Sequence, residues 1–248
     1  MSLVGADASA FLQGLVTQDV SRVGTSFAAL LTPQGKILFD FFLYPQADGF
    51  FIDCAASAAP ALMKRLSIYK LRAKITLREE ASRAVAVGAG ASDPRHAGLP
   101  ARAIVERENQ PSVDADYDAL RLSLGVPEFG ADFGGEEMFL LDVNYDALNA
   151  VSYAKGCFVG QEVTSRMKRK GEIRKRTMMA RFDGAPPPKG TAVTAGDQTI
   201  GEALSGGDGI ALALVRTDRL KEAENAGATP SADGRPLRLA FPPYLERS

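Results

Sequence analysis

The chain has 248 residues, of which 46% are hydrophobic and 24% are charged, and its formal net charge is −1. This composition is typical of a globular protein, and it excludes a global positive field that would attract nucleic acid or an anionic membrane. No apolar run approaches the roughly 20 residues of a membrane span, and the start lacks the pattern of a signal peptide. We therefore expect a cytoplasmic protein with no membrane partner.

The first part of the chain predicts an irregular series of helices and strands. Residues 4–15 are expected to form a short strand and then a helix that Asp7 caps. Apolar runs at 37–44 and 50–54 flank a turn and predict a β-hairpin, and apolar residues at helical spacing predict a helix over 57–70. Further elements are expected as strands at 74–78, 84–87 and 104–107 and a helix at 116–124. This irregular order favours an α+β fold over a doubly wound sheet.

The pattern changes near residue 175. Short strands separated by Gly- and Pro-rich turns are expected at 177–182, 191–194, 198–205, 210–215 and 237–241. Strands at this spacing predict a small barrel or sandwich. We therefore expect two domains, over residues 1–175 and 176–248.

The chain has two cysteines, Cys54 and Cys157, and one histidine, His96. Two thiols are too few for a disulfide framework, and even with the histidine they are too few to hold an iron–sulfur cluster. We expect no stably bound metal, and we interpret His96 as an ordinary surface residue in a turn-rich loop. Cys54 follows an apolar strand and is interpreted as an inert core thiol.

Residues 155–162 read Lys-Gly-Cys-Phe-Val-Gly-Gln-Glu, which places Cys157 between a lysine and the start of a predicted helix. A neighbouring cation and a helix N-terminus both lower the pKa of a thiol, so we expect Lys155 to help ionise Cys157. The thiol is then a nucleophile, a redox sensor or a transient metal ligand, and the sequence leaves these three roles open.

This block resembles the signature Lys-Gly-Cys-aromatic-x-Gly-Gln-Glu of the YgfZ-type folate-binding proteins. These proteins are relatives of the glycine-cleavage T-protein, an aminomethyltransferase, and they support iron–sulfur cluster assembly or repair. The resemblance extends to the segments 5–20, 35–36, 69–74, 201–202 and 211–216. It implies a T-protein-like folate-binding domain that holds tetrahydrofolate or a polyglutamylated derivative, with the cysteine loop at the rim of its pocket and a small β-barrel after it. Iron–sulfur client or assembly proteins are the implied partners.

The resemblance also implies roles for particular residues. Cys157 and Lys155 are the expected catalytic pair. The expected folate contacts are Asp40, Arg121, Gly156, Phe158, Gly160, Gln161, Glu162 and Arg166. In T-protein relatives an acidic residue near the folate matches Asp40, although an outward-pointing carboxylate is an equal alternative. True aminomethyltransferases have a glutamate that binds the pterin at the position where this chain has Ser123. This difference puts aminomethyl transfer and enzymatic turnover in doubt.

A basic run follows the motif, consisting of Arg166, Lys168, Arg169, Lys170, Arg174, Lys175 and Arg176. It predicts either a solvated face or a surface for a polyanion, such as a folate polyglutamate tail or tRNA. Residues 167–179 contain no aromatic side chain for base stacking, which weakens the tRNA alternative. The leading hypothesis is thus a folate-binding accessory protein for iron–sulfur proteins. The alternatives are a folate-dependent aminomethyl or methyl transferase and a tRNA- or protein-interaction module.

Overall fold

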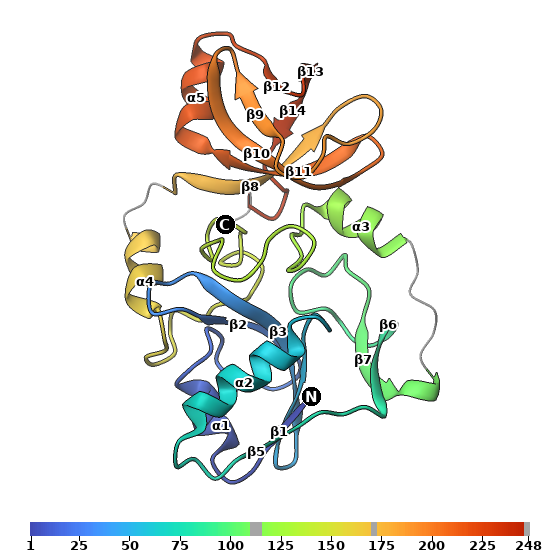
Figure 1. Cartoon of the computed structure of the whole chain (residues 1–248), viewed down its shortest axis with the longest axis vertical. Helices are drawn as coiled ribbons and strands as arrows, with labels where there is room; N and C mark the ends of the chain where they lie inside the picture. Colours follow the sequence, from blue (N-terminus) through green and yellow to red (C-terminus); the bar gives the residue numbers. More distant parts are fainter. Residues whose placement is uncertain (110–115, 170–172, 246–248) are drawn as a thin grey trace. The chain divides into compact units, whose positions relative to one another are not determined.

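The chain folds into two compact units in a computed structural model that describes residues 1–109, 116–169 and 173–245 (Figure 1). The first unit comprises Met1–Asp114 and Leu148–Val163, and the second comprises Ala115–Ala147 and Thr164–Ser248. The first unit is therefore built from two separate stretches of sequence. Among the described residues, no helix combines the length and the apolar character needed to cross a membrane.

A five-stranded antiparallel sheet and a separate two-stranded hairpin form the first unit. Its elements are β1 (Ser2–Val4), α1 (Ala8–Gln13), β2 (Ser26–Leu31), β3 (Ile37–Gln46), β4 (Gly49–Asp53), α2 (Ala59–Lys70), β5 (Thr76–Arg78), β6 (Arg83–Ala91), β7 (Arg102–Glu106) and the 3-10 helix η1 (Arg107–Asn109). The strand order in the sheet is β2-β3-β4-β1-β5, and β6 pairs with β7. The expected hairpin is confirmed as β3 and β4, which pair up to Gln46 and Gly49.

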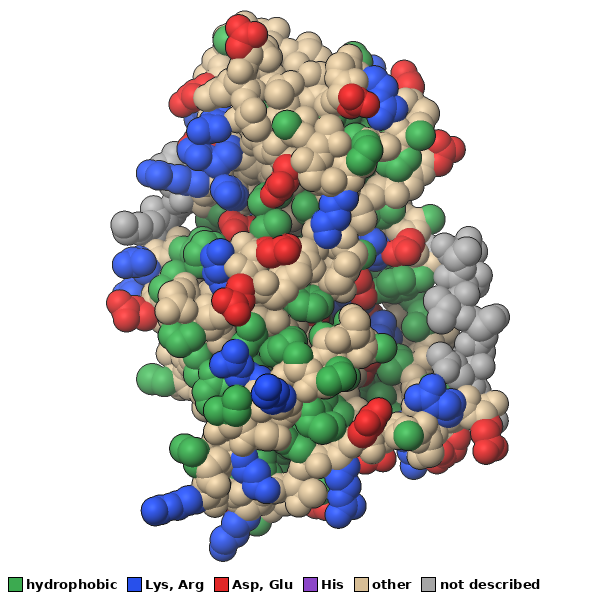
Figure 2. Space-filling model, in the orientation of Figure 1, with side chains coloured by type: hydrophobic (Ala, Val, Ile, Leu, Met, Phe, Trp, Pro, Cys, Tyr) green, Lys and Arg blue, Asp and Glu red, His purple; other side chains and the backbone are tan. Residues whose placement is uncertain are grey.

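β3 is the most buried strand of this sheet, because its first eight residues are all buried. They are aliphatic and aromatic, apart from Asp40, and such residues suit a strand covered on both faces. α2 begins with Pro60 in its first turn and buries Leu62 and Leu66. The surface over α2 carries Lys and Arg side chains among hydrophobic ones (Figure 2).

The cap expected for α1 is different in the structure. Asp7 stands at the N-cap position, but its side chain makes no capping hydrogen bond. Its carboxylate instead accepts a hydrogen bond from the Lys74 amide at 2.7 Å, because the segment before β5 runs beside the start of α1. A long-range partner has therefore replaced the local one.

The second unit is built on a seven-stranded antiparallel sheet. Its elements are α3 (Asp116–Leu124), β8 (Lys175–Arg181), β9 (Ala192–Ala195), β10 (Gln198–Gly207), β11 (Ile210–Arg216), α5 (Thr217–Asn225), β12 (Pro230–Ala232), β13 (Arg235–Pro236) and β14 (Arg238–Ala240), and α4 (Gln161–Arg169) crosses from the first unit into it. The strand order is β13-β12-β9-β10-β11-β8-β14. Its core includes Met178, Val193, Ile200, Ala213 and Val215.

The division into compact units does not follow the expected boundary at residue 175. β8 does start at Lys175, where the barrel was expected to begin. Residues 115–147 nevertheless belong to the second unit, because Arg121 donates a hydrogen bond to Ser205 and Asn144 donates one to the carbonyl of Thr177. Long-range hydrogen bonds of this kind leave no signal in the sequence.

Candidate functional site

The segment before Cys157 is bound to residues 16–18 by side-chain and backbone hydrogen bonds. Thr17 Oγ1 donates to the Ala150 carbonyl at 2.6 Å, and Gln18 Nε2 donates to the Asn149 carbonyl at 2.6 Å. The Ser152 amide donates back to the Thr17 carbonyl at 3.0 Å. These bonds fix the course of the chain three to six residues before the motif, and we call residues 16–18 and 149–155 together the clamp.

Lys155 closes the clamp. Its ammonium is buried and donates to the carbonyls of Val16 at 2.6 Å and Gln18 at 2.9 Å. The same ammonium lies 5.5 Å from the centroid of the Phe158 ring, in a cation–π contact. Burial lowers the pKa of Lys155 to about 8, and the charge of Asp19 opposes this shift.

These contacts change the role of Lys155 from the expected one. We expected its charge to act on the neighbouring thiol, but the ammonium is directed to two backbone carbonyls and an aromatic ring. Lys155 therefore anchors the loop that carries Cys157, and its contacts give no support to activation of the thiol. Phe158, expected to touch folate, is buried beneath the Lys155 ammonium.

Cys157 itself is an exposed free thiol, as the leading hypothesis requires. Gly156 is also exposed, and a Cβ added there would meet nothing within 4 Å. Gly160 differs, since its φ is +80° and an added Cβ would lie 2.7 Å from the Thr32 carbonyl oxygen. The loop is therefore open at Cys157 and tightly packed three residues later, against the turn that precedes β3.

A row of backbone pairings connects the clamp with Asp40. Asp40 lies opposite Ala29 in the pairing of β3 with β2, and Thr17 exchanges hydrogen bonds with Ala29 through its amide and its hydroxyl. The carbonyl of Thr17 in turn accepts a hydrogen bond from the Ser152 amide. Three steps of about 4.8 Å each separate the β3 backbone from residues 149–155 of the clamp, if each has the spacing of adjacent strands. Asp40 and the loop of Cys157, which the sequence predicted to form one site, therefore lie in the same unit.

Asp40 shares its face of β3 with Phe42 and Tyr44, since alternate residues of a strand point the same way. The guanidinium groups of Arg95 and Arg102 lie 4.8 Å and 4.3 Å from the centroid of the Phe42 ring. Tyr44 Oη is buried beside the Arg102 guanidinium and makes no well-formed hydrogen bond among the described residues. Burial, together with the nearby charge of Asp53, raises the pKa of Tyr44 to about 12, so its hydroxyl stays protonated.

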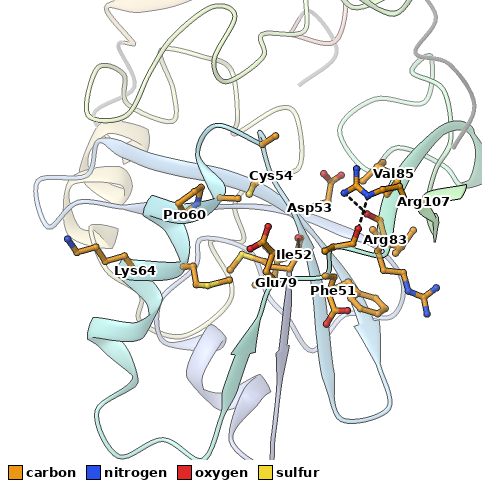
Figure 3. A pocket seen from close by; sticks show the side chains of 18 of the residues that line it. Phe51, Ile52, Asp53, Cys54, Pro60, Lys64, Glu79, Arg83, Val85 and Arg107 are labelled. Carbon is orange, nitrogen blue, oxygen red and sulfur yellow. Dashed lines mark hydrogen bonds between the residues drawn. The ribbon is translucent and has the colours of Figure 1, made fainter.

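A pocket of about 700 Å³ opens in the first unit between α2, the end of β4 and the β6–β7 hairpin (Figure 3). Its walls include Cys54, which Figure 3 shows between Pro60 and Asp53, while Lys64 extends away from them. Residues 155–162 do not contribute to its lining. We expected the loop of Cys157 at the rim of a folate pocket, whereas this pocket has the other cysteine in its wall.

The two thiols should react at very different rates. Burial, and secondarily the charge of Asp53, raises the pKa of Cys54 from 9.0 to about 11, so almost none of its thiolate is present at pH 8. Iodoacetamide at pH 8 should therefore label Cys157 first, as peptide mass spectrometry would show, with the Cys157→Ala variant as the control.

The raised pKa of Cys54 also gives stability a pH dependence. Stability from the protonated thiol is fully present below about pH 9 and is lost as the pH rises through about 11. The Cys54→Ala variant should lack this loss in unfolding curves measured over the same range. Faster labelling of Cys54 than of Cys157 in the native protein would contradict this assignment.

Arg121 does not have the environment of a folate ligand. Its side chain is 2% exposed, and it donates from Nη1 to Asp132 at 2.8 Å, from Nη2 to Ser205 at 2.9 Å and from Nε to Asp118 at 2.6 Å. Asp132, fully buried, also accepts hydrogen bonds from the amides of Glu128 and Ser205. All three guanidinium nitrogens thus bind within the second unit, and the predicted folate contact of Arg121 is not supported.

The remaining predicted residues lie on α4 and after it. Gln161 begins the helix, and Glu162 and Arg166 are exposed on it. Arg176 is buried and forms a bidentate ion pair with Asp146, which removes it from the basic run. Lys170 lies outside the described residues. The exposed part of the run is therefore Arg166, Lys168, Arg169, Arg174 and Lys175.

Three residues of this site were not singled out from the sequence. Thr17 and Gln18 belong to a segment that resembles the family, but nothing in the sequence indicates that they bind residues more than 130 positions away. Tyr44 stands four residues after Asp40 in an alternating strand. That spacing is a signal that would have placed both side chains on one face.

Comparisons with known proteins agree with this architecture. The family model described as "CAF17, C-terminal beta-barrel domain" matches residues 174–247. Among solved structures, the glycine cleavage system aminomethyltransferase T from Bartonella henselae has a TM-score of 0.68 and 16% identity, covering 97% of this chain and 81% of that chain. The class is thus an α+β protein with the fold of the T-protein and a near-closed C-terminal β-barrel, as predicted.

Two relatives are similar over nearly the whole chain. The human iron-sulfur cluster assembly factor IBA57, mitochondrial, is 31% identical over 268 residues, covering 88% of this chain and 75% of that protein. The IBA57 homologue of Pyricularia oryzae is 31% identical, covering 94% of this chain and 74% of that protein. This chain belongs to the IBA57/CAF17, or YgfZ-type, family of iron–sulfur cluster assembly factors, which confirms the resemblance found in its motif.

Proposed function

We propose that this protein binds tetrahydrofolate and supports iron–sulfur cluster assembly or repair through the thiol of Cys157. The observation that carries the proposal is the exposure of Cys157 on a loop that the clamp holds in the same unit as Asp40. A thiol that must meet a partner protein has to be both accessible and held in a defined position. The names of the relatives support the iron–sulfur part of the proposal.

The face of β3 around Asp40 fits a folate. A carboxylate can accept two N–H groups from the aminopyrimidine edge of a pterin, and Asp40 is a buried carboxylate on an apolar strand. Tyr44 adds a buried hydroxyl that lies beside the Arg102 guanidinium and makes no well-formed hydrogen bond among the described residues, so a ligand can supply one. Bound tetrahydrofolate would supply one-carbon chemistry, and the role of this chain would be to bind and orient it.

The geometry favours an accessory role over aminomethyl transfer. Ser123, which replaces the pterin-binding glutamate expected of a true aminomethyltransferase, is exposed and donates its hydroxyl to the Leu120 carbonyl of its own helix. The similarity to the Bartonella enzyme supports the fold alone. We therefore place the protein with iron–sulfur client or assembly proteins in the cytoplasm and assign it no turnover.

Replacing Cys157 with alanine should abolish the function in cells and leave folate binding intact. A deletion strain expressing Cys157→Ala should remain deficient in cluster-dependent enzyme activities, because no other exposed thiol exists in this chain. Cys54→Ala, the matched control, should restore them, since Cys54 is half-buried and inert. Calorimetric titration with tetrahydrofolate should give equal affinities for both variants and the wild type.

Two outcomes would separate the parts of this proposal. Full rescue by Cys157→Ala would show that the thiol is dispensable. Failure of the wild-type protein to bind tetrahydrofolate, with the thiol still essential, would remove the folate and keep the cysteine. Release of product from an aminomethyl donor by the wild-type protein would favour the transferase alternative.

A further inference from the structure

Positive charge is concentrated on α2 and on the segment that follows it. Residues 54–78 contain no Asp or Glu but contain six cations in a chain of net charge −1, namely Lys64, Arg65, Lys70, Arg72, Lys74 and Arg78. Figure 2 shows Lys and Arg side chains among hydrophobic ones over the region that α2 occupies in Figure 1. The segment is therefore a local positive surface on a nearly neutral protein.

None of these six cations takes part in an ion pair within the part of the chain that the structure describes. The ion pairs there are made by other arginines, which are Arg83, Arg95, Arg102, Arg121, Arg176 and Arg216. The carboxylate of Asp7 accepts the backbone amide of Lys74 and offsets the charge at that end of the segment. The uncompensated charge is thus centred on α2 itself.

Two aliphatic side chains are exposed among these cations. Ile68 is 59% exposed and shares one face of α2 with Lys64, four residues earlier, and Leu71, the residue directly after the helix, is 89% exposed. Arg65 and Arg72 are the next residues after Lys64 and Leu71. We call Lys64, Arg65, Ile68, Leu71 and Arg72 the basic face, and its residues Lys64 and Ile68 lie on the side of α2 opposite the buried Leu62 and Leu66.

Leu71 is also held in an uncommon backbone conformation. Its φ is 43° and its ψ is −106°, a positive-φ conformation that is rare for a leucine and costs about 1–3 kcal/mol. The side chain is almost fully exposed, so packing of that side chain does not offset this cost. An exposed leucine in this position has a physical use if another surface covers it.

We propose that the basic face docks an acidic amphipathic helix of a partner protein. Carboxylates of the partner would lie against Lys64, Arg65 and Arg72, and its apolar stripe would cover Ile68 and Leu71. This combination is the apolar centre and charged rim of a protein interface. The surface is separate from Cys157 and its clamp, so the inference goes beyond the proposed function.

Other polyanions fit this face less well. Aromatic side chains on which bases stack typically strengthen the binding of single-stranded nucleic acid, and the basic face has none. A helix that lies on a membrane has an apolar stripe along its full length. Here the exposed large aliphatic residues of the segment are limited to the C-terminal end of α2 and the residue after it.

Binding of a synthetic peptide to the whole protein tests this inference. The probe is an amphipathic helix with glutamate on its polar face and leucine on its apolar face, titrated by fluorescence anisotropy. The double variant Lys64→Glu/Arg72→Glu should raise the dissociation constant at least about tenfold, which corresponds to about 1.4 kcal/mol. The control Lys221→Glu/Arg238→Glu makes the same change in net charge at exposed residues of α5 and β14 and should leave it within about twofold.

A neutral double variant separates docking from simple charge attraction. Ile68→Ser/Leu71→Ser should weaken the peptide and leave the affinity for poly-glutamate unchanged. Equal weakening by the two charge variants, or absence of saturable peptide binding, would overturn the inference. So would tighter binding of single-stranded RNA or phosphatidylserine vesicles than of the peptide, if that binding depended on Lys64 and Arg72. Circular dichroism checks that each variant is folded.

Discussion

Replacing Asp132 with alanine should lower the free energy of unfolding by about 3–5 kcal/mol. The substitution leaves the Arg121 guanidinium buried without its principal counter-charge, and it also removes the acceptor for the amides of Glu128 and Ser205. A lone buried charge is far more costly than a missing surface pair. The loss is a large fraction of the total stability of a domain, which is about 5–15 kcal/mol.

Asp118→Ala is the matched control, because Asp118 binds the same guanidinium from a side chain that is 72% exposed. Its loss should cost less than about 1 kcal/mol, since solvent screens an exposed ion pair. Urea unfolding followed by circular dichroism measures both variants. Equal losses for Asp118→Ala and Asp132→Ala would show that burial does not decide the strength of this network.

The second large effect is expected at Gly160. Gly160→Ala should cost about 2–4 kcal/mol, because alanine at φ +80° is strained and its Cβ would lie 2.7 Å from a backbone oxygen and 3.1 Å from the Cα of Gly35. Backbone atoms on both sides cannot move as a flexible side chain can. The loop that carries Cys157 should shift away from the turn at Thr32, and amide hydrogen exchange in residues 155–162 should accelerate.

Gly156→Ala provides the control within the same motif. Gly156 has no positive φ, and nothing lies within 4 Å of an added Cβ, so the change should alter stability by less than about 0.5 kcal/mol. Denaturant unfolding and hydrogen exchange compare the two variants. A Gly156→Ala variant as unstable as Gly160→Ala would mean that the space around Gly156 is occupied by other atoms of the protein.

The sequence predicted those features that depend on local pattern. The β3–β4 hairpin, α2, the strands of the barrel and the α+β class follow from alternation, helical spacing and turn residues. α5 was missed because only Leu220 and Ala223 of its nine residues are buried, which is too few for a recognisable apolar stripe. The short strands β12 and β13 were missed for a similar reason, since they contain only three and two residues.

The candidate site was predicted less completely, because its decisive contacts are long-range. The motif identified Cys157 and its family, and the exposure of the thiol agrees with that prediction. The role of Lys155 depends on carbonyls 139 and 137 residues earlier in the chain, and local sequence carries no trace of them. Arg121 was interpreted from its place in a resemblance, whereas its partners Asp132 and Ser205 come from other parts of the second unit.

The interrupted course of the first unit has a consequence for biosynthesis. When residues 1–114 of a nascent chain have emerged from the ribosome, Thr17 and Gln18 still lack their hydrogen-bond acceptors. These acceptors are the carbonyls of Ala150 and Asn149, which emerge only later. Closing so large a loop is entropically costly and slow. The segment that carries Cys157 is therefore the last part of the first unit to be seated, and a chain that ends before residue 148 lacks both this cysteine and the acceptors of Thr17 and Gln18.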